Sequence, residues 1–221
     1  MNKFMPAIIL LLSISLFLAA RPAAAAVDIA VKNDKGSPVE DAVVYLLPSA
    51  GKAPALSAET SAVMDQVNRQ YVPRVLPVRT GTTVRFPNSD NILHHVYSFS
   101  PAKTFELPLY KGKTVEPILF DKPGAVVLGC NIHDWMLGYI LVVDTPFFSK
   151  TGVDGKAKLH DVPPGDYKVY IWHPDLKDEK KTGVGPLTVG ESGQKALEYK
   201  ISVKPRRKPR QAPVNPGGSG Y

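Results

Sequence analysis

A single cysteine, Cys130, occurs among the 221 residues, and the motifs of several common enzyme classes are missing. One cysteine excludes a disulfide within the chain, so this thiol is expected to be free, paired with another molecule or bound to a metal. The sequence contains no glycine-rich phosphate loop, no G-x-S-x-G nucleophile elbow and no H-E-x-x-H zinc motif. Because these signals are absent, we expect the protein not to be an enzyme.

Long apolar runs are scarce, and the longest lies at the N-terminus. Lys3 precedes an apolar run over residues 7–20, and small residues then extend to Ala26. The run is too short to cross a bilayer comfortably, and the alanines offer a cleavage site, so residues 1–26 are predicted to be a secretory signal peptide. No cysteine lies near it, which excludes a lipoprotein anchor. We therefore expect a periplasmic protein whose mature form has no transmembrane segment.

The formal net charge is +7, but the basic excess is confined to the two ends of the chain. Between residues 27 and 203 basic and acidic residues balance, so we expect no nucleic-acid binding. Residues 204–221 combine five basic residues with Pro and Gly and no acid, a composition that predicts a disordered tail. This tail either solubilises the protein or tethers it to an acidic partner or an anionic surface.

Helical periodicity is nearly absent, and only residues 59–70 could form one short helix. Short runs rich in Val, Ile, Tyr and Phe recur instead between Gly, Pro, Asn and Asp, as is typical of strands. The predicted strands are 27–32, 42–47, 82–86, 95–99, 115–120, 125–128, 139–143, 159–162, 166–172 and 196–203. This pattern predicts an all-β protein built from β-sandwiches.

Cys130, His133 and Met136 follow one another at steps of three residues. Thiolate, imidazole and thioether together suit copper that cycles between Cu(I) and Cu(II), and blue-copper sites combine two His, one Cys and a weak axial Met. One more histidine would then have to come from elsewhere in the chain. The alternative is a buried structural cysteine beside a core methionine.

The missing histidine is expected upstream, where Asn88-Ser-Asp-Asn-Ile-Leu precedes His94 and His95. Together with Phe120-Asp-Lys-Pro-Gly124 and Cys130-x2-His133-x2-Met136-x-Gly138, this stretch resembles the plastocyanin-like cupredoxins over residues 70–146, and the short ligand loop is most similar to amicyanin. The resemblance implies a Greek-key sandwich that holds one type 1 copper ion and exchanges single electrons with redox partner proteins.

The same resemblance implies His94, Cys130, His133 and Met136 as the copper ligands. Adjacent strand residues point to opposite faces, so His94 and His95 cannot both face copper; His95 is the alternative ligand. His95 stands where the family usually has Asn, and could be a solvent-facing imidazole, a competing ligand or a proton-linked switch. Before the cysteine, Val127-Leu128-Gly129 stands in place of the aromatic residue that the family often has there. Trp135 in the loop could be a hydrophobic lid or part of a docking surface.

The segments 27–48 and 147–203 carry a different pattern, with an Asp-Lys-Gly turn at residues 34–36, an Asp-Gly turn at 154–155 and a Pro-Pro-Gly turn at 163–165. Together they resemble the carboxypeptidase regulatory-like module, a small prealbumin-like (transthyretin-like) β-sandwich. The resemblance implies that a cupredoxin domain over residues 49–146 is inserted into this module. A tandem layout, in which residues 27–47 supply the first cupredoxin strands, is the alternative.

The combined architecture is similar to that of methylamine utilization proteins, which implies a place near an amine-oxidising chain. A different class of function is also open, namely a non-redox protein that handles copper or scaffolds the cell envelope. Visible absorption from thiolate bound to Cu(II) would separate the two, because only the first predicts an intense band.

Overall fold

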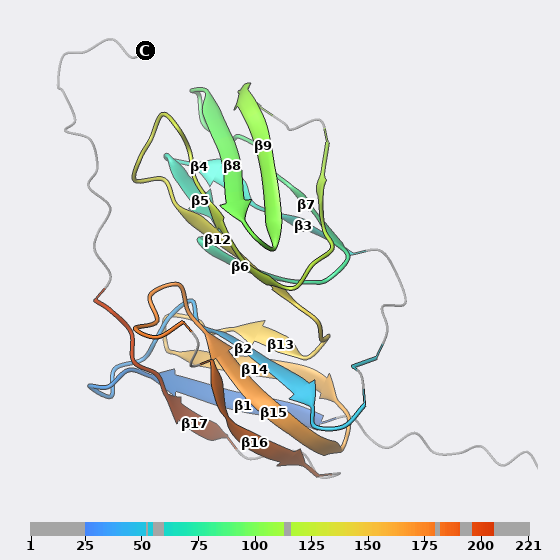
Figure 1. The fold of residues 1–221 in the computed structure, drawn as a ribbon. Helices are drawn as coiled ribbons and strands as arrows, with labels where there is room; N and C mark the ends of the chain where they lie inside the picture. The colour runs from blue at the N-terminus through green and yellow to red at the C-terminus, as the bar shows by residue number, and fades with distance from the viewer. Residues whose placement is uncertain are drawn as a thin grey trace, which may run out of the picture.

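The computed structural model describes residues 25–51, 53–54, 60–112, 116–179, 182–190 and 196–205, and every regular element in these ranges is a β-strand. The strands build two stacked β-sandwiches (Figure 1), so the all-β prediction is confirmed. The predicted signal peptide up to residue 24 and the predicted tail from residue 206 lie outside the described residues. In the described part of the chain, no helix is long and apolar enough to cross a membrane.

The lower sandwich in Figure 1 combines strands from both ends of the described chain. One sheet has the order β14–β1–β17, in which β1 (Ala25–Lys32) pairs antiparallel with β14 (Lys156–Val162) and parallel with β17 (Leu197–Lys200). The other sheet has the order β13–β2–β15–β16. Its strands are β13 (Phe148–Lys150), β2 (Val43–Pro48), β15 (Gly165–Trp172) and β16 (Gly183–Val189). Ala25 and Ala26, which the sequence assigned to the signal peptide, lie in β1; the cleavage position stays a prediction.

The upper sandwich contains the strands between β2 and β13 in the sequence. Its sheets have the orders β10–β7–β3 and β11–β12–β6, with the pairs β4–β5 and β8–β9 beside them. A bridge between Tyr97 and Gly129 joins β8 to the end of β11. The strands are β3 (Ser61–Val63), β4 (Asp65–Val67), β5 (Gln70–Val72), β6 (Val75–Arg79), β7 (Thr82–Arg85), β8 (His94–Ser100), β9 (Lys103–Tyr110), β10 (Ile118–Phe120), β11 (Gly124–Leu128) and β12 (Gly138–Val143).

The helix considered for residues 59–70 is wrong for the residues that are described, because residues 60–70 contain β3, β4 and the start of β5. The backbone of Asn68 and Arg69 shows why. Both have positive φ, 53° and 56°, and lie between the antiparallel strands β4 and β5. Positive φ at both central residues is the signature of a type I′ hairpin turn and is incompatible with a right-handed helix.

β12, the central strand of the sheet β11–β12–β6, is buried on both faces. Ile140 and Val142 of β12 pack into the core of the upper sandwich, whereas Leu141 and Val143 pack into the core of the lower one. This follows from the alternation of side chains along a strand, applied to a run that is apolar at every position. Val75 of β6 also joins the lower core. The two sandwiches therefore share this sheet, while the domain limits at residues 49 and 146 stay a prediction.

A group of charged residues crosses the junction of the two sandwiches beside the shared sheet. Arg74, just before β6, lies 3.1 Å from Asp175 and 3.6 Å from Asp41, and Asp41 also accepts a hydrogen bond from Lys150 at 2.6 Å. The Asp41 side chain is only 8% exposed, so its two cationic partners are what makes burial of the carboxylate tolerable.

Candidate metal centre

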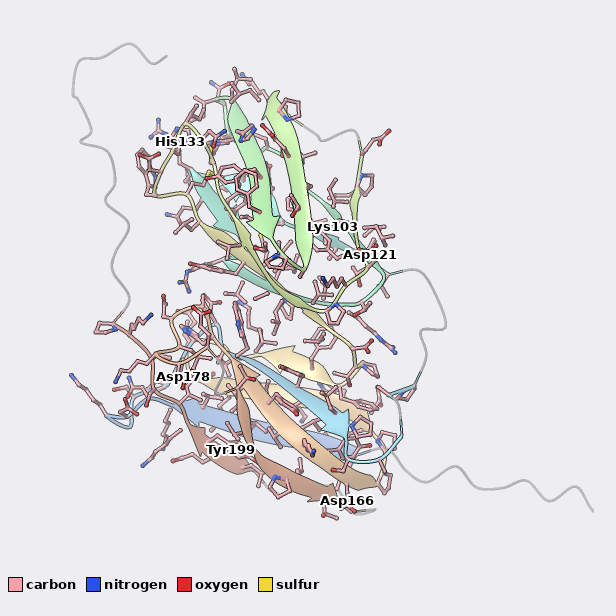
Figure 2. The ribbon with its side chains drawn as sticks, in the orientation of Figure 1. Lys103, Asp121, His133, Asp166, Asp178 and Tyr199 are labelled. Atoms are coloured by element: carbon pink, nitrogen blue, oxygen red, sulfur yellow. The ribbon has the colours of Figure 1, made fainter. Side chains whose placement is uncertain are left out.

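Cys130, His133 and Met136 lie on the loop that connects β11 to β12. The loop is tight, because the Met136 N–H donates to the carbonyl of His133 at 2.8 Å. Figure 2 shows His133 toward the end of the upper sandwich that is remote from the lower sandwich. The candidate site therefore lies far from the lower sandwich. Its loop nevertheless leads directly into β12, the strand whose side chains enter both cores.

Three ligand atoms converge beside this loop. The Nδ1 atoms of His94 and His133 are 3.1 Å apart, and the Cys130 Sγ lies 4.0 Å from the first and 3.7 Å from the second. For typical bonds of about 2.0 Å to nitrogen and about 2.3 Å to sulfur, a trigonal site would separate the nitrogens by about 3.5 Å and each nitrogen from the sulfur by about 3.7 Å. The triangle therefore has the size needed to hold one ion.

Burial suits the triangle to a metal that needs a dry site. His94 is fully buried and Cys130 is 3% exposed, whereas His133 is half-buried. Met136 is 1% exposed and belongs to the same apolar cluster as Cys130. This places the thioether on the buried side of the loop, and its role as weak axial ligand stays a prediction.

The two adjacent histidines have different surroundings. His94 faces Cys130 and His133, whereas the Nε2 of His95 lies 2.8 Å from the Glu106 carboxylate. His95 is 5% exposed, so the interpretation as a solvent-facing imidazole is wrong. Its Nδ1 is buried without a hydrogen-bond partner among the described residues. The structure thus brings His94 to the candidate site and directs His95 away from it.

A carboxylate on the far side of His94 fixes which ring nitrogen faces the site. The His94 Nε2 lies 2.7 Å from Asp90 and its Nδ1 faces Cys130 and His133, so a neutral His94 ring that donates its Nε2 proton to Asp90 has the Nδ1 lone pair free for a metal. Asp90 also accepts hydrogen bonds from the backbone N–H groups of Asn68 at 2.6 Å and Arg69 at 2.8 Å. A carboxylate that orients a ligating imidazole is a common arrangement at metal sites.

The pKa values at the site favour forms that can bind a metal. Burial lowers the pKa of His133, and the neighbouring His94 and Arg69 lower it further, so the neutral imidazole is favoured. For Asp90, burial alone would raise the pKa, but the hydrogen bonds from Arg69, His94 and Asn68 outweigh it and hold the pKa below its usual range. Near neutral pH the site therefore offers a neutral His133, together with an ionised Asp90 that is hydrogen-bonded to the His94 ring.

The backbone just before Cys130 is held on two sides by tyrosines. Gly129 exchanges backbone hydrogen bonds with Tyr97, and its carbonyl accepts a bond of 2.9 Å from the Tyr71 hydroxyl. A Cβ at Gly129 would lie only 2.5 Å from the Tyr97 ring. Tyr97 of β8 thus fills the space beside Gly129 that a side chain there would occupy. In the loop, the Trp135 ring lies edge-on to the His133 ring, with centroids 5.3 Å apart.

Sequence reasoning did not single out Asp90, Tyr71 or Tyr97 as parts of the site. A signal for Asp90 was present, because an acid four residues before a candidate ligand histidine can reach the ring nitrogen that faces away from the metal. The two tyrosines gave no such signal. They reach Gly129 through pairings that bring together residues far apart in the sequence.

The donor set suits copper and does not suit the hard cations magnesium and calcium. One thiolate and two imidazoles in a buried triangle, with a thioether nearby, match the preference of copper for soft and borderline donors. Among the described residues this is the one group of at least three His, Cys, Asp or Glu side chains close enough to share an ion, and it contains no carboxylate. Magnesium and calcium, which prefer oxygen ligands, are therefore poor candidates.

No family model matches the chain, and no curated protein matches it. Among solved structures, the chain is similar to a Cu-containing nitrite reductase (NirK) from Thermus scotoductus SA-01, with 30% identity and a TM-score of 0.36 over 43% of this chain and 25% of the reductase. It is also similar to a purple cupredoxin from Nitrosopumilus maritimus, with 23% identity and a TM-score of 0.33 over 38% of this chain and all of that one. A reduced amicyanin mutant gives 22% identity and a TM-score of 0.35 over 45% of this chain and 98% of amicyanin.

These neighbours are cupredoxins. This chain spans about a quarter of the nitrite reductase, and less than half of this chain is matched in each case. The function therefore has to be argued from the geometry of this chain's own residues.

Proposed function

We propose that the protein is a one-electron carrier that binds a single type 1 copper ion through His94, Cys130 and His133, with Met136 as the weak axial ligand. The observation that carries this proposal is the triangle of Nδ1, Nδ1 and Sγ atoms, which has the size and chemistry of a blue-copper site before any ion is added. When bound, copper supplies a couple that gains and loses one electron without making or breaking a covalent bond.

The scaffold holds its ligands rigidly, which electron transfer requires. His94 is fixed by Asp90, Cys130 follows a glycine that β8 and Tyr71 anchor, and the loop leads into the buried strand β12. Ligands that are held in place by packing and by further hydrogen bonds change little between oxidation states. A small change of geometry keeps the barrier to electron exchange low.

The surface around His133 suits transient contact with a redox partner protein. His133 is the ligand that reaches the surface, and three exposed apolar side chains belong to the loops around the site, namely Leu93, Ile132 and Leu137 at 48%, 49% and 48% exposure. An apolar area around an electron exit point brings a partner close without a specific polar fit. We propose that partners dock here.

The predicted signal peptide supports a periplasmic location, and the proposal assigns no enzymatic reaction to the chain. A place in an amine-oxidising chain belongs to the same proposal and rests on the resemblance to methylamine utilization proteins. The basic tail would add contact with an acidic partner or an anionic surface.

The proposal is tested by adding one equivalent of Cu(II) to the metal-free protein and recording its visible and electron paramagnetic resonance spectra. We expect an intense thiolate-to-Cu(II) absorption band that is bleached by reductant and restored by oxidant. Cys130→Ser should abolish the band, and the matched control His160→Gln, at an exposed histidine of β14, should leave it intact. A colourless protein, or one that takes up only Cu(I), would favour copper handling or envelope scaffolding instead.

A further inference from the structure

We propose that Asp90 is the positioning residue of this metal centre: its carboxylate fixes the tautomer in which the His94 Nδ1 binds copper, and its negative charge lowers the reduction potential of the bound ion. This inference rests on the proposed function and names the residue that tunes the same site. Asp90 does not belong to the triangle of ligand atoms, and it acts only through His94.

The contacts of the carboxylate leave little freedom in its orientation. Its side chain is 14% exposed and lies 2.7 Å from the His94 Nε2. On the other side, the type I′ turn between β4 and β5 directs the N–H groups of Asn68 and Arg69 at the two carboxylate oxygens. A hairpin more than twenty residues away in sequence thus determines the position of the group that orients His94.

The loop that carries Asp90 is also fixed from within. The Asp90 N–H donates to the side-chain oxygen of Asn88 at 3.0 Å, and Asn88 is 3% exposed. The Asn88 side-chain nitrogen donates to the carbonyls of Ile92 and Tyr110, both at 2.9 Å. These bonds tie the loop to the end of β9, so Asp90 does not depend on His94 for its place.

The charge at Asp90 favours the oxidised state. The candidate ligands contribute one negative charge, from the Cys130 thiolate, so the centre would be net positive with Cu(II) and neutral with Cu(I). A carboxylate hydrogen-bonded to a ligand stabilises the more positive state, because the attraction acts through a buried imidazole where solvent screens little. Reduction adds one electron and leaves the Asp90–His94 bond in place.

Two substitutions separate orientation from charge. Asp90→Asn keeps an oxygen that can accept from the His94 Nε2–H and removes the charge, so the tautomer should persist and the potential should rise. Asp90→Ala removes both the acceptor and the charge, so the tautomer should be lost and the potential should also rise. The matched control is Asp65→Asn. Asp65 bonds to Gln66 and Ser89 near the same hairpin and contacts neither ligand histidine in the described part of the chain.

The first measurement needs no metal. Long-range proton–nitrogen NMR of the metal-free, full chain at pH 8 should show His94 protonated at Nε2 in the natural protein, in Asp90→Asn and in Asp65→Asn. In Asp90→Ala we expect a mixture of tautomers. An unchanged tautomer in Asp90→Ala, or a proton on Nδ1 in the natural protein, would overturn the positioning role whatever copper does.

The second measurement is the potential of the copper-loaded protein. Losing an outer partner of a ligand typically weakens metal binding by about 10- to 100-fold. We expect Asp90→Asn to weaken the binding of Cu(II) relative to that of Cu(I) by about tenfold. This raises the reduction potential by about 59 mV for one electron, and the shift in Asp65→Asn should be much smaller. Equal shifts in the two Asn variants would contradict the specific role of Asp90.

The two proposals can fail separately. If the natural protein shows no thiolate-to-Cu(II) band while the tautomer depends on Asp90, electron transfer is wrong and the positioning role stands. If the band forms but neither Asp90 variant changes the tautomer or the potential, the positioning role is wrong and electron transfer stands.

Discussion

Gly129 is the residue at which two tyrosines meet the backbone that carries the candidate thiolate. We expect Gly129→Ala to destabilise the protein by about 1–3 kcal/mol, because the added methyl group would overlap the Tyr97 ring. Urea unfolding measures the loss. Gly190→Ala is the control, since a Cβ there meets no atom within 4 Å.

Combining Gly129→Ala with Tyr97→Leu tests whether the overlap is the cause. The smaller side chain should relieve the overlap, so the double variant should lose less stability than the sum of the two single changes. Additive losses would show that the glycine is needed for another reason.

Met136 offers a second residue-level prediction. Leu has a similar volume, so Met136→Leu at this buried position should cost less than about 1.5 kcal/mol. If Met136 is the axial ligand, the intense band should persist, because thiolate and imidazoles remain. The potential should rise, because Cu(II) loses a donor. Cyclic voltammetry of the copper-loaded protein measures the change, and an unaltered potential would remove Met136 from the ligand set.

The ligand motif itself could be predicted from the sequence because Cys130, His133 and Met136 are local neighbours whose side chains one short loop can gather. The orienting carboxylate could not be predicted as securely. Its position depends on two backbone N–H groups of a hairpin turn. The residue types of Asn68 and Arg69 do not indicate in which direction those N–H groups point. The choice of His94 over His95 likewise depends on which face of β8 meets the ligand loop.

Among the elements, the β4–β5 hairpin has a turn whose sequence is not ideal. Arg69 adopts a φ of 56°, a conformation that costs an ordinary residue roughly 1–2 kcal/mol and glycine little. Arg69→Gly should therefore be more stable than Arg69→Ala by about 1 kcal/mol, as measured by thermal or urea unfolding. The backbone N–H that binds Asp90 is kept in both variants, so the His94 tautomer should not change. Equal stabilities would show that the turn is not strained.

Short runs rich in apolar residues predicted most of the elements near the cores, such as β1, β12 and β15. The strands that were missed have shorter or interrupted signals. In β9 the alternation is limited to the four residues Thr104 to Leu107, because Pro108 interrupts the run. β3 and β4 have three residues each, which is too short to show the alternation of a strand. The apolar residues across both strands are spaced like those on one side of a helix.

For the whole molecule, the shared sheet predicts that the two sandwiches unfold together. Leu141→Ala removes a buried side chain from the lower core, and we expect a loss of about 2–5 kcal/mol. Because β12 also leads out of the ligand loop, bleaching of the copper band and loss of β-sheet signal should follow the same transition in urea. Two separate transitions would show that the sandwiches are independent.

The junction also makes stability depend on pH. His173 is buried beside Asp175, and the charged groups Arg74 and Asp41 lie near it; its Nε2 donates to the carbonyl of Glu40. Burial lowers the pKa of His173 below the ordinary 6.5. Near pH 6 the His173 side chain therefore binds a proton more readily in the unfolded chain than in the folded one. The free energy of unfolding should fall as the pH drops below about 6.5.

Replacing this histidine tests the sign of that dependence. His173→Gln should flatten the fall in unfolding free energy between pH 7.5 and 5.5, as measured by urea unfolding at each pH. The exposed His160 serves as a comparison, and His160→Gln should keep the slope of the natural protein. Part of the fall should remain, because the pKa of His133 is also lowered; a slope as steep as that of the natural protein would contradict the role of His173.

Because β12 is buried on both faces, we expect that neither sandwich is stable and soluble when it is produced without the other. A fragment limited to residues 60–146 would turn Val75, Leu141 and Val143 into an open apolar wall, and such walls attract other copies or aggregate. A stand-alone version of the copper-binding half would need polar side chains at these positions. In a related chain, polar residues at the positions of Val75, Leu141 and Val143 would indicate that its copper-binding sandwich folds without the second sandwich.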